Sequence, residues 1–255
     1  MKFFGFLFPA LFSCLLSLGQ KEDLYYLDHD FRGTDDAKKA KYLLSIKNYN
    51  DTLWQYDTYR IIGPLLSSEY FKDKDATIAQ GRFRYYGADG RLDSIAQYSN
   101  NLKQGSSYYF NDTGAVYREL VYDKGVLKED IDALNRKLEI VKKDSSNSSQ
   151  DVVFSKIETE SEFEGGLPGW ARYLNKNLKY PERAINNNIR GTVVIQFIVD
   201  KEGKVDALEI FRSVEYSIDK VALDIIRKSP RWVPAVQNGW KVKSYKRQPI
   251  VFALN

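Results

Sequence analysis

The sequence predicts an α+β chain with two domains. The first is an antiparallel β-hairpin repeat domain, and the second is a three-stranded antiparallel sheet with two helices. Three observations predict this: a 24-residue repeat in the first half, a polar strip in the middle, and a helix, hairpin, helix, strand order near the C-terminus. We expect the repeat domain at residues 20–143, a linker at 144–160 and the second domain at 161–255.

Residues 1–19 are predicted to form an export signal. Lys2 precedes an apolar stretch, and small residues stand three and one positions before a cleavage point at Gln20. The apolar stretch is shorter than the roughly 20 residues that span a bilayer. We therefore expect a periplasmic protein, with an uncleaved inner-membrane anchor and a lipid on Cys14 as alternatives. Membrane contact is expected only if this segment is retained.

The first half contains two copies of one unit. Residues 81–104 align without gaps on residues 105–128, and the matching pairs are Gly81/Gly105, Tyr85/Tyr109, Tyr86/Phe110, Gly90/Gly114 and Tyr98/Tyr122. Each copy predicts a strand, a turn ending in glycine, a second strand and another turn. The pattern resembles MORN-type repeats, which implies a scaffold or a protein-interaction surface. The recurring tyrosines are interpreted either as core residues or as a binding face.

The C-terminal elements follow from local patterns. Trp170 to Leu178 shows apolar spacing typical of a helix, and Pro181 ends it. Alternation over 191–199, a turn at 200–203 and a return over 205–211 predict a β-hairpin.

A second helix is expected after Ser217, whose hydroxyl is a typical N-cap, with an apolar stripe that begins at Ile218. Pro230 ends this helix. An extended crossing then begins at Trp232, and residues 249–254 form the last strand.

Short motifs recur in a familiar order along this domain. They are Phe163-Glu164-Gly165-Gly166, Tyr180-Pro181, Gly191-Thr192-Val193, Phe197-Ile198-Val199, Gly203-Lys204-Val205, Asp219 with Ala222, Pro230-Arg231-Trp232-Val233-Pro234-Ala235, Gln237-Asn238-Gly239 and Pro249-Ile250-Val251-Phe252. This set resembles the TonB C-terminal domain, in the form common in Bacteroidetes-type proteins, and implies a TonB/TolA-like fold. Ala235 departs from the glycine that family members often carry there.

The resemblance implies a peptide-binding edge strand at the C-terminus. An extended segment of an outer-membrane receptor would add to this strand through backbone hydrogen bonds. The residues implied are Lys246, Arg247, Gln248, Ile250, Val251 and Phe252, with Lys246 and Arg247 drawing acidic groups. The side chains of Ile250 and Phe252 are also interpreted as core. Trp232 and Trp240 are interpreted either as the lining of a peptide groove or as buried structural residues.

Nothing in the sequence predicts an enzyme. His29 is the sole histidine, so neither a histidine-based metal site nor a catalytic triad can be assembled, and Asp28-His29-Asp30 is interpreted as a surface patch. No phosphate-binding glycine loop or nucleophile elbow is present. The net charge of +4 is too small to favour nucleic acid. We expect no catalytic residue, no cofactor and no metal.

Three functions remain open at this stage, the last of which is a repeat-based cell-envelope interaction protein whose TonB-like domain only dimerises or holds a peptide. The first is a TonB-like periplasmic protein that docks receptor peptides by β-strand addition in energy-coupled transport across the outer membrane. The alternative is a soluble periplasmic protein-binding or scaffold module without energy transduction. The expected partners are TonB-dependent outer-membrane receptors or other envelope proteins, and a second copy of this chain is a further expected partner.

Overall fold

The computed structural model describes residues 22–50, 52–132 and 158–254. The chain divides into two compact units, Met1–Asp144 and Ser145–Asn255. The predicted signal at 1–19 and most of the predicted linker lie outside the described residues. Among the helices of the described ranges, none has the length and apolar character needed to cross a bilayer.

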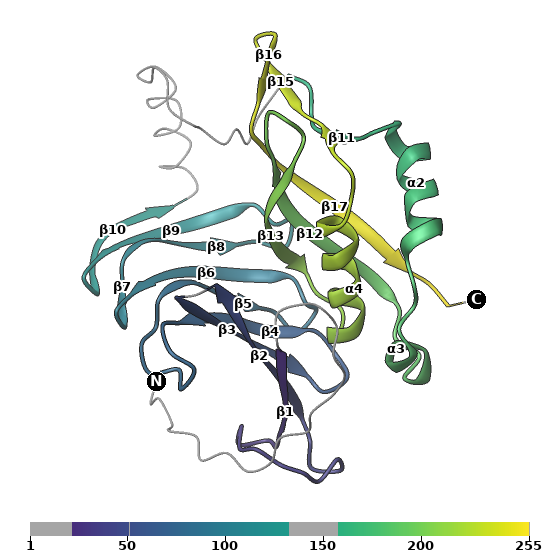
Figure 1. The fold of residues 1–255 in the computed structure, drawn as a ribbon. Helices are drawn as coiled ribbons and strands as arrows, with labels where there is room; N and C mark the ends of the chain where they lie inside the picture. The colour runs from purple at the N-terminus through teal and green to yellow at the C-terminus, as the bar shows by residue number, and fades with distance from the viewer. Residues whose placement is uncertain (1–21, 51, 133–157, 255) are drawn as a thin grey trace. The chain divides into compact units, whose positions relative to one another are not determined.

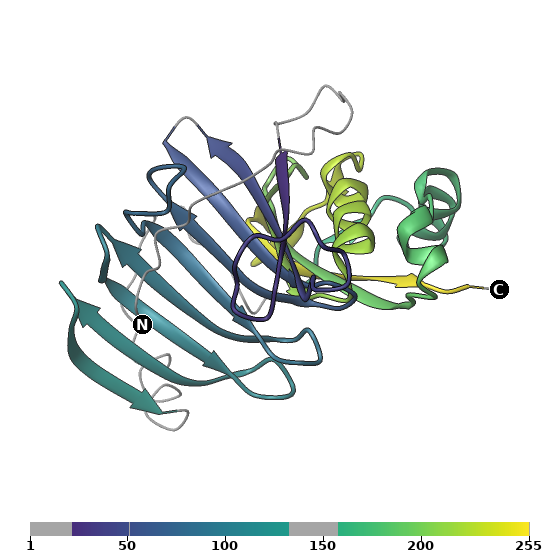
Figure 2. The same ribbon diagram turned by 90° about the horizontal axis from the view of Figure 1, so that it is seen from below.

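The first unit is one antiparallel sheet whose strands follow each other in chain order (Figure 1). Figure 2 shows the twist that this sheet acquires across its strands. The order is β1-β2-β3-β4-β5-β6-β8-β9-β10, with the short β7 paired to β6. The strands are β1 (Glu22–Leu27), β2 (Tyr42–Asn50), β3 (Leu53–Arg60), β4 (Leu65–Phe71), β5 (Gly81–Tyr86), β6 (Leu92–Ser99), β7 (Leu102–Lys103), β8 (Gly105–Phe110), β9 (Val116–Asp123) and β10 (Val126–Asp132).

The turns of the two repeat copies have the same geometry. Gly90 and Gly114 both adopt positive φ angles, of 77° and 76°. Each donates its N–H to the carbonyl oxygen three residues earlier, at 3.0 Å and 2.8 Å respectively. Glycine is needed here because an L side chain disfavours this backbone conformation. The predicted N-terminal series of β-hairpins is confirmed, as is the α+β class of the whole chain.

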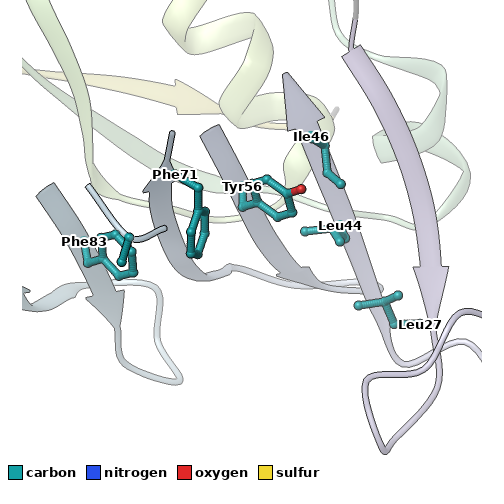
Figure 3. Close-up of a cluster of buried hydrophobic side chains, with 7 residues drawn as sticks. Leu27, Leu44, Ile46, Tyr56, Phe71 and Phe83 are labelled. Atoms are coloured by element: carbon teal, nitrogen blue, oxygen red, sulfur yellow. The ribbon is translucent and has the colours of Figure 1, made fainter. Parts of the chain in front are cut away.

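One face of this sheet carries its hydrophobic core. Figure 3 shows Leu27, Leu44, Ile46, Tyr56, Phe71 and Phe83 along neighbouring strands. Tyr56 and Phe71 meet edge to face with their ring centroids 5.1 Å apart, and Phe71 and Phe83 do so at 5.3 Å. Aromatic rings pack well on such a pleated surface because they bury large areas with few rotatable bonds. The rings of Tyr56, Phe71 and Phe83 are therefore core residues, and of the recurring tyrosines, Tyr85 and Tyr98 are partly buried against this cluster.

The second unit combines a three-stranded antiparallel sheet, in the order β13-β12-β17, with helices and two short two-stranded sheets. Figure 1 shows α4 beside β12 and β13. The elements are β11 (Glu162–Phe163), α2 (Gly166–Asn177), α3 (Glu182–Asn186), β12 (Gly191–Val199), β13 (Val205–Arg212), α4 (Tyr216–Arg227), β14 (Trp232–Val233), β15 (Ala235–Gln237), β16 (Trp240–Val242) and β17 (Ser244–Phe252).

The structure differs from the sequence prediction in four places, the first of which is the last strand, β17, which begins at Ser244 and not at residue 249. Helix α2 begins at Gly166, four residues before the predicted start, because glycines at 165 and 166 take the positive φ angles that its tight entry requires. A short helix, α3, follows Pro181 and was not predicted. The crossing after Trp232 contains a hairpin, β15–β16, whose turn is Asn238-Gly239 with both φ angles positive.

The N-cap of α4 is Glu215, so the prediction of Ser217 is wrong. A carboxylate oxygen of Glu215 accepts the backbone N–H of Ser217 at 2.7 Å. The other carboxylate oxygen of Glu215 accepts from Arg183 Nε at 2.6 Å. The helix therefore starts two residues earlier than the hydroxyl pattern indicates. Its cap is the buried carboxylate of Glu215, whose ion pair with Arg183 also ties α3 to α4.

The core of the second unit lies between the sheet and its helices. Every second residue of β12, from Val193 to Val199, is fully buried. Trp232 packs edge to face against Phe163 and Phe197, with centroid separations of 5.4 Å and 5.0 Å. Residues 158–160, expected in the linker, belong to this unit, because Thr159 pairs with Val236 through two backbone hydrogen bonds.

Candidate functional site

The candidate site is the outer side of β17, the last strand of the three-stranded sheet. Its register with β12 runs without interruption from the pair Gly191/Phe252 to the pair Val199/Ser244. No other strand within the described ranges pairs with β17, and Figure 1 shows it at the end of the sheet. One row of backbone groups along this strand therefore lacks a ladder partner among the described residues.

Pro249 shows which backbone groups point outward. Proline has no N–H, so within a regular ladder its nitrogen must face away from the neighbouring strand. Its carbonyl oxygen accepts a hydrogen bond from the side-chain amide of Gln248 at 3.2 Å. Alternation along an antiparallel strand then places the backbone groups of Tyr245, Arg247 and Val251 on the same side as those of Pro249. We call the outward N–H and C=O groups of these four residues the β17 margin.

The side chains of β17 alternate between the two faces of the sheet. Ile250 and Phe252 are buried, and the ring of Phe252 meets Tyr180 edge to face at 5.7 Å. Val251 is 64% exposed and Tyr245 is 42% exposed. Ile250 and Phe252 are therefore core residues, which is one of the two interpretations given for these side chains. The sequence analysis did not name Tyr245. It lies four residues before Pro249, and this spacing places both residues on the same face of a strand.

The two cations expected to draw acidic groups already have partners in this chain. Lys246 Nζ lies 3.0 Å from a carboxylate oxygen of Glu160. The guanidinium of Arg247 lies 3.6 Å from the ring centroid of Phe211 and donates to the side-chain oxygen of Gln196 at 2.8 Å. Burial in this position lowers the pKa of Arg247 from its ordinary value. Both cations therefore make interactions within this chain, and their expected attraction of a partner's acidic groups stays a prediction.

Of the two interpretations of Trp232 and Trp240, burial supports the structural one for Trp232. Trp232 is 3% exposed, and its indole N–H donates to the hydroxyl of Ser229 at 2.9 Å. A ring this deeply enclosed does not line an open groove. Trp240 is 75% exposed, directly after the turn between β15 and β16. The two rings therefore have different environments, one in the core and one at the surface.

Asp28, His29 and Asp30 gather near each other in a surface turn of the first unit. Their potential ligand atoms lie within 4.8 Å of one another. An oxygen of Asp28 accepts the backbone N–H groups of Asp30 and Arg32 at 2.9 Å and 3.0 Å. These hydrogen bonds, with the one from Arg32 largest, lower the pKa of Asp28. The carboxylate closes the turn, which agrees with its interpretation as a surface patch.

Residues 176–254 match the family model of the Gram-negative bacterial TonB protein C-terminal. This match supports the TonB C-terminal family. It covers the sheet that carries the β17 margin and begins inside α2, so Phe163 and Trp170 of the aromatic core lie before it. The TonB C-terminal family is a non-enzymatic family of envelope proteins in transport and energy transduction. Comparisons with curated proteins and with solved structures found no match.

Proposed function

We propose that this chain is a TonB-like periplasmic protein that docks receptor segments at the β17 margin in energy-coupled transport across the outer membrane. The observation that carries the proposal is the margin itself, which has no ladder partner among the described residues and lies inside the segment that matches the family. The proposed partners are TonB-dependent outer-membrane receptors or other envelope proteins. The resemblance of the first unit to MORN-type repeats supports a further protein-interaction role there.

The strength of such docking follows from backbone hydrogen bonds. The margin offers the N–H groups of Tyr245, Arg247 and Val251 and the carbonyl groups of all four margin residues. Each intermolecular backbone hydrogen bond contributes about 0.5–1.5 kcal/mol net, because the groups exchange water for protein partners. A partner strand therefore gains a few kcal/mol before side chains contribute. Affinity of this order suits a contact that forms and releases repeatedly.

The test replaces Val251 with proline and, as a matched control, with alanine. Val251→Pro removes one outward N–H and places ring atoms at the margin, while the hydrogen bonds toward β12 remain. Val251→Ala removes the same exposed side chain and keeps the N–H. We expect binding of a labelled receptor N-terminal segment to weaken about tenfold in the proline variant and about twofold or less in the alanine variant.

Urea unfolding of both variants checks that each is folded. Equal affinity of the two folded variants for the receptor segment would contradict docking at the β17 margin. The proposed periplasmic placement is checked by the intact mass of the protein isolated from cells. A chain that starts at Gln20 supports the soluble periplasmic form, and a chain that retains residues 1–19 supports the membrane-anchored transducer.

A further inference from the structure

Polar and apolar side chains alternate along one edge of the first unit, where its strands are joined by turns. The apolar members, Ile78, Leu102 and Val126, stand 24 positions apart and are 37%, 48% and 58% exposed. Each lies opposite a polar residue of the preceding strand. We call these six residues the edge row: Lys72, Ile78, Ser99, Leu102, Asp123 and Val126. Exposed apolar residues that recur at the period of the repeat, rather than singly, indicate a contact surface.

The turns that carry the edge row are stacked on one another with a constant stagger. The backbone N–H of Asn101 donates to the carbonyl oxygen of Ala79 at 3.1 Å, and the N–H of Gly125 donates to that of Lys103 at 2.8 Å. The donors of these two bonds are 24 positions apart, and so are the acceptors. Two strands also separate consecutive turns, which spaces them by about 10 Å. The middle polar residue of the edge row therefore lies midway between the two charged ones.

The edge row lies on the face of the sheet that is opposite the aromatic core. The residues that follow its first two apolar members pair with Phe71 and Tyr98, whose rings belong to the core cluster or pack against it. Tyr122, the repeat equivalent of Tyr98, pairs with the residue that follows Val126. Because successive side chains of a strand point to opposite faces, the edge row faces away from these rings.

The two charged members give the edge row opposite charges on either side of its centre. Lys72 and Asp123 are both exposed, and each has a hydrogen bond to a neutral side-chain amide, at 2.6 Å and 3.3 Å. Neither forms an ion pair with a described residue of this chain. Lys124 and Lys128 are also exposed, beyond Asp123 at the Val126 end. A surface that pairs with the span from Lys72 to Asp123 must therefore be acidic at one end and basic at the other.

Other charged groups of these turns lie on the core face. The hydroxyl of Tyr56 donates to the carbonyl oxygen of Lys74. Burial, and after it the charge of Asp75, raises the pKa of that hydroxyl. The ammonium group of Lys103 lies 4.8 Å from the ring centroid of Tyr122. These groups therefore do not alter the charge pattern of the edge row.

We propose that the edge row is an interface between two copies of this chain, related by a two-fold axis that passes beside Ser99. In this antiparallel arrangement, Lys72 faces Asp123 of the second copy, and Ile78 packs beside Leu102 of the second copy. Both contacts occur twice, because a two-fold axis repeats each of them. The equal spacing of the three polar residues allows the charged and apolar contacts to form together. A parallel arrangement would instead place Lys72 against Lys72.

This interface is made by side chains, since the stacked turns already use the backbone N–H groups of Asn101 and Gly125. Three partly exposed apolar residues and their flanks form a smaller patch than the about 800 Å² per partner of a standard interface. The dimer is therefore weak, with an expected dissociation constant of about 10–100 µM. The inference specifies the interaction role proposed for the first unit and is independent of docking at the β17 margin.

Sedimentation equilibrium of the protein isolated from cells, from about 5 µM to about 500 µM, tests the dimer. We expect Lys72→Asp and Asp123→Lys each to raise the dissociation constant about tenfold, because each variant brings like charges together twice. The double variant Lys72→Asp/Asp123→Lys restores opposite charges and should return to within about threefold of the unaltered protein. Failure of the double variant to recover, when urea unfolding shows all three variants to be folded, would overturn the inference.

Two leucine variants form a matched pair. Leu102 and Leu127 are both 48% exposed, but Leu127 pairs with Tyr122 on the core face. Leu102→Ser should raise the dissociation constant about tenfold and Leu127→Ser about twofold or less, because only the first removes apolar area from the interface. Equal effects of the two changes would overturn the inference.

Cross-linking locates the axis. The background is Cys14→Ser, because Cys14 is the only cysteine of the chain. Ser99→Cys places two thiols beside the axis, on sheets about 10 Å apart, so a short bismaleimide should join them at least about fivefold faster than in Val126→Cys. Equal rates at the two positions, or a protein that stays monomeric at every concentration, would overturn the inference.

The variant Val251→Pro separates this dimer from docking at the β17 margin. It should leave the dimer unchanged while it weakens binding of the receptor segment. Loss of the dimer in this variant would place the contact at the β17 margin and overturn the inference. Because receptor binding is measured on the same preparations, failure of the dimer and failure of docking are read independently.

Discussion

Asp219 is a buried carboxyl group in α4 whose ionisation should control the stability of the second unit. Its side chain is completely buried. Ser213 hydrogen-bonds one carboxyl oxygen, and the N–H of Val214 donates to the other at 3.0 Å. Replacement by asparagine keeps the size, allows both hydrogen bonds and removes the charge. The variant Asp219→Asn therefore isolates the cost of a buried carboxylate.

The sign and size of the effect follow from the pKa. Burial raises the pKa of Asp219 from 3.8 to about 7, although hydrogen bonds from Ser213 and Val214 act in the opposite direction. The folded state thus holds this proton more tightly than the unfolded state. Its contribution to stability is complete below about pH 4 and is lost as the pH rises to about 7. The whole interval corresponds to about 4 kcal/mol.

We expect Asp219→Asn to gain about 2–4 kcal/mol relative to the unaltered protein between about pH 4 and pH 8. We measure this difference by urea unfolding at each pH, followed by the fluorescence of the buried Trp170 and Trp232. The contributions of the other titrating groups cancel from the difference, because both proteins contain those groups. Asp224→Asn, a surface change in the same helix, is the control. The reasoning is refuted if the unaltered protein gains on the variant as the pH rises, because the N-terminus of α4 would then be stabilising the charged form.

Three further predictions concern packing and titration elsewhere. Gly203→Ala should lower the free energy of unfolding by about 2–4 kcal/mol, because the new Cβ would lie 2.0 Å from the carbonyl oxygen of Trp232. The control Gly239→Ala, with a similar φ and open space around it, should lower the free energy of unfolding by about 1 kcal/mol. Equal losses for the two variants in urea unfolding would contradict the clash. Trp232→Ala should cost about 3–5 kcal/mol in the same assay, and a loss below about 1 kcal/mol would mean that the ring is not a core element. Burial raises the pKa of Glu69 from 4.5 to about 7, so the stability that this group contributes is lost as the pH rises through that interval. Glu69→Gln should therefore become more stable relative to the unaltered protein from about pH 5 to pH 8, when unfolding of the first unit is followed by Trp54 fluorescence. Parallel stability curves for the two proteins would show that Glu69 is solvated.

Local patterns were sufficient for several elements. The repeat with its paired glycines predicts the hairpins of the first unit, because a turn that needs positive φ is specified by the residue in it. The alternation of 191–199 and the turn at Asp200 predict β12 and its return strand in the same way. The position of Pro249 near the C-terminus already indicates an edge strand, since proline is excluded from central strands.

Other features depend on contacts between distant residues. Glu160 and Lys246 are 86 positions apart, so no local sequence pattern predicts their ion pair. The N-cap of α4 was misassigned because a hydroxyl at 217 is a typical cap, whereas Arg183 from another helix holds Glu215 in the capping position.

The sequence by itself determined the turns and strands of the repeat and of the β12–β13 hairpin, because the conformational preferences of glycine and of alternating apolar residues act within a few positions. Only the tertiary structure decided which side chains of β17 are buried, where the charges of Lys246 and Arg247 are directed and that Asp219 is enclosed. Burial and ion pairing depend on packing between elements far apart in the chain, and no short stretch of residues contains that information.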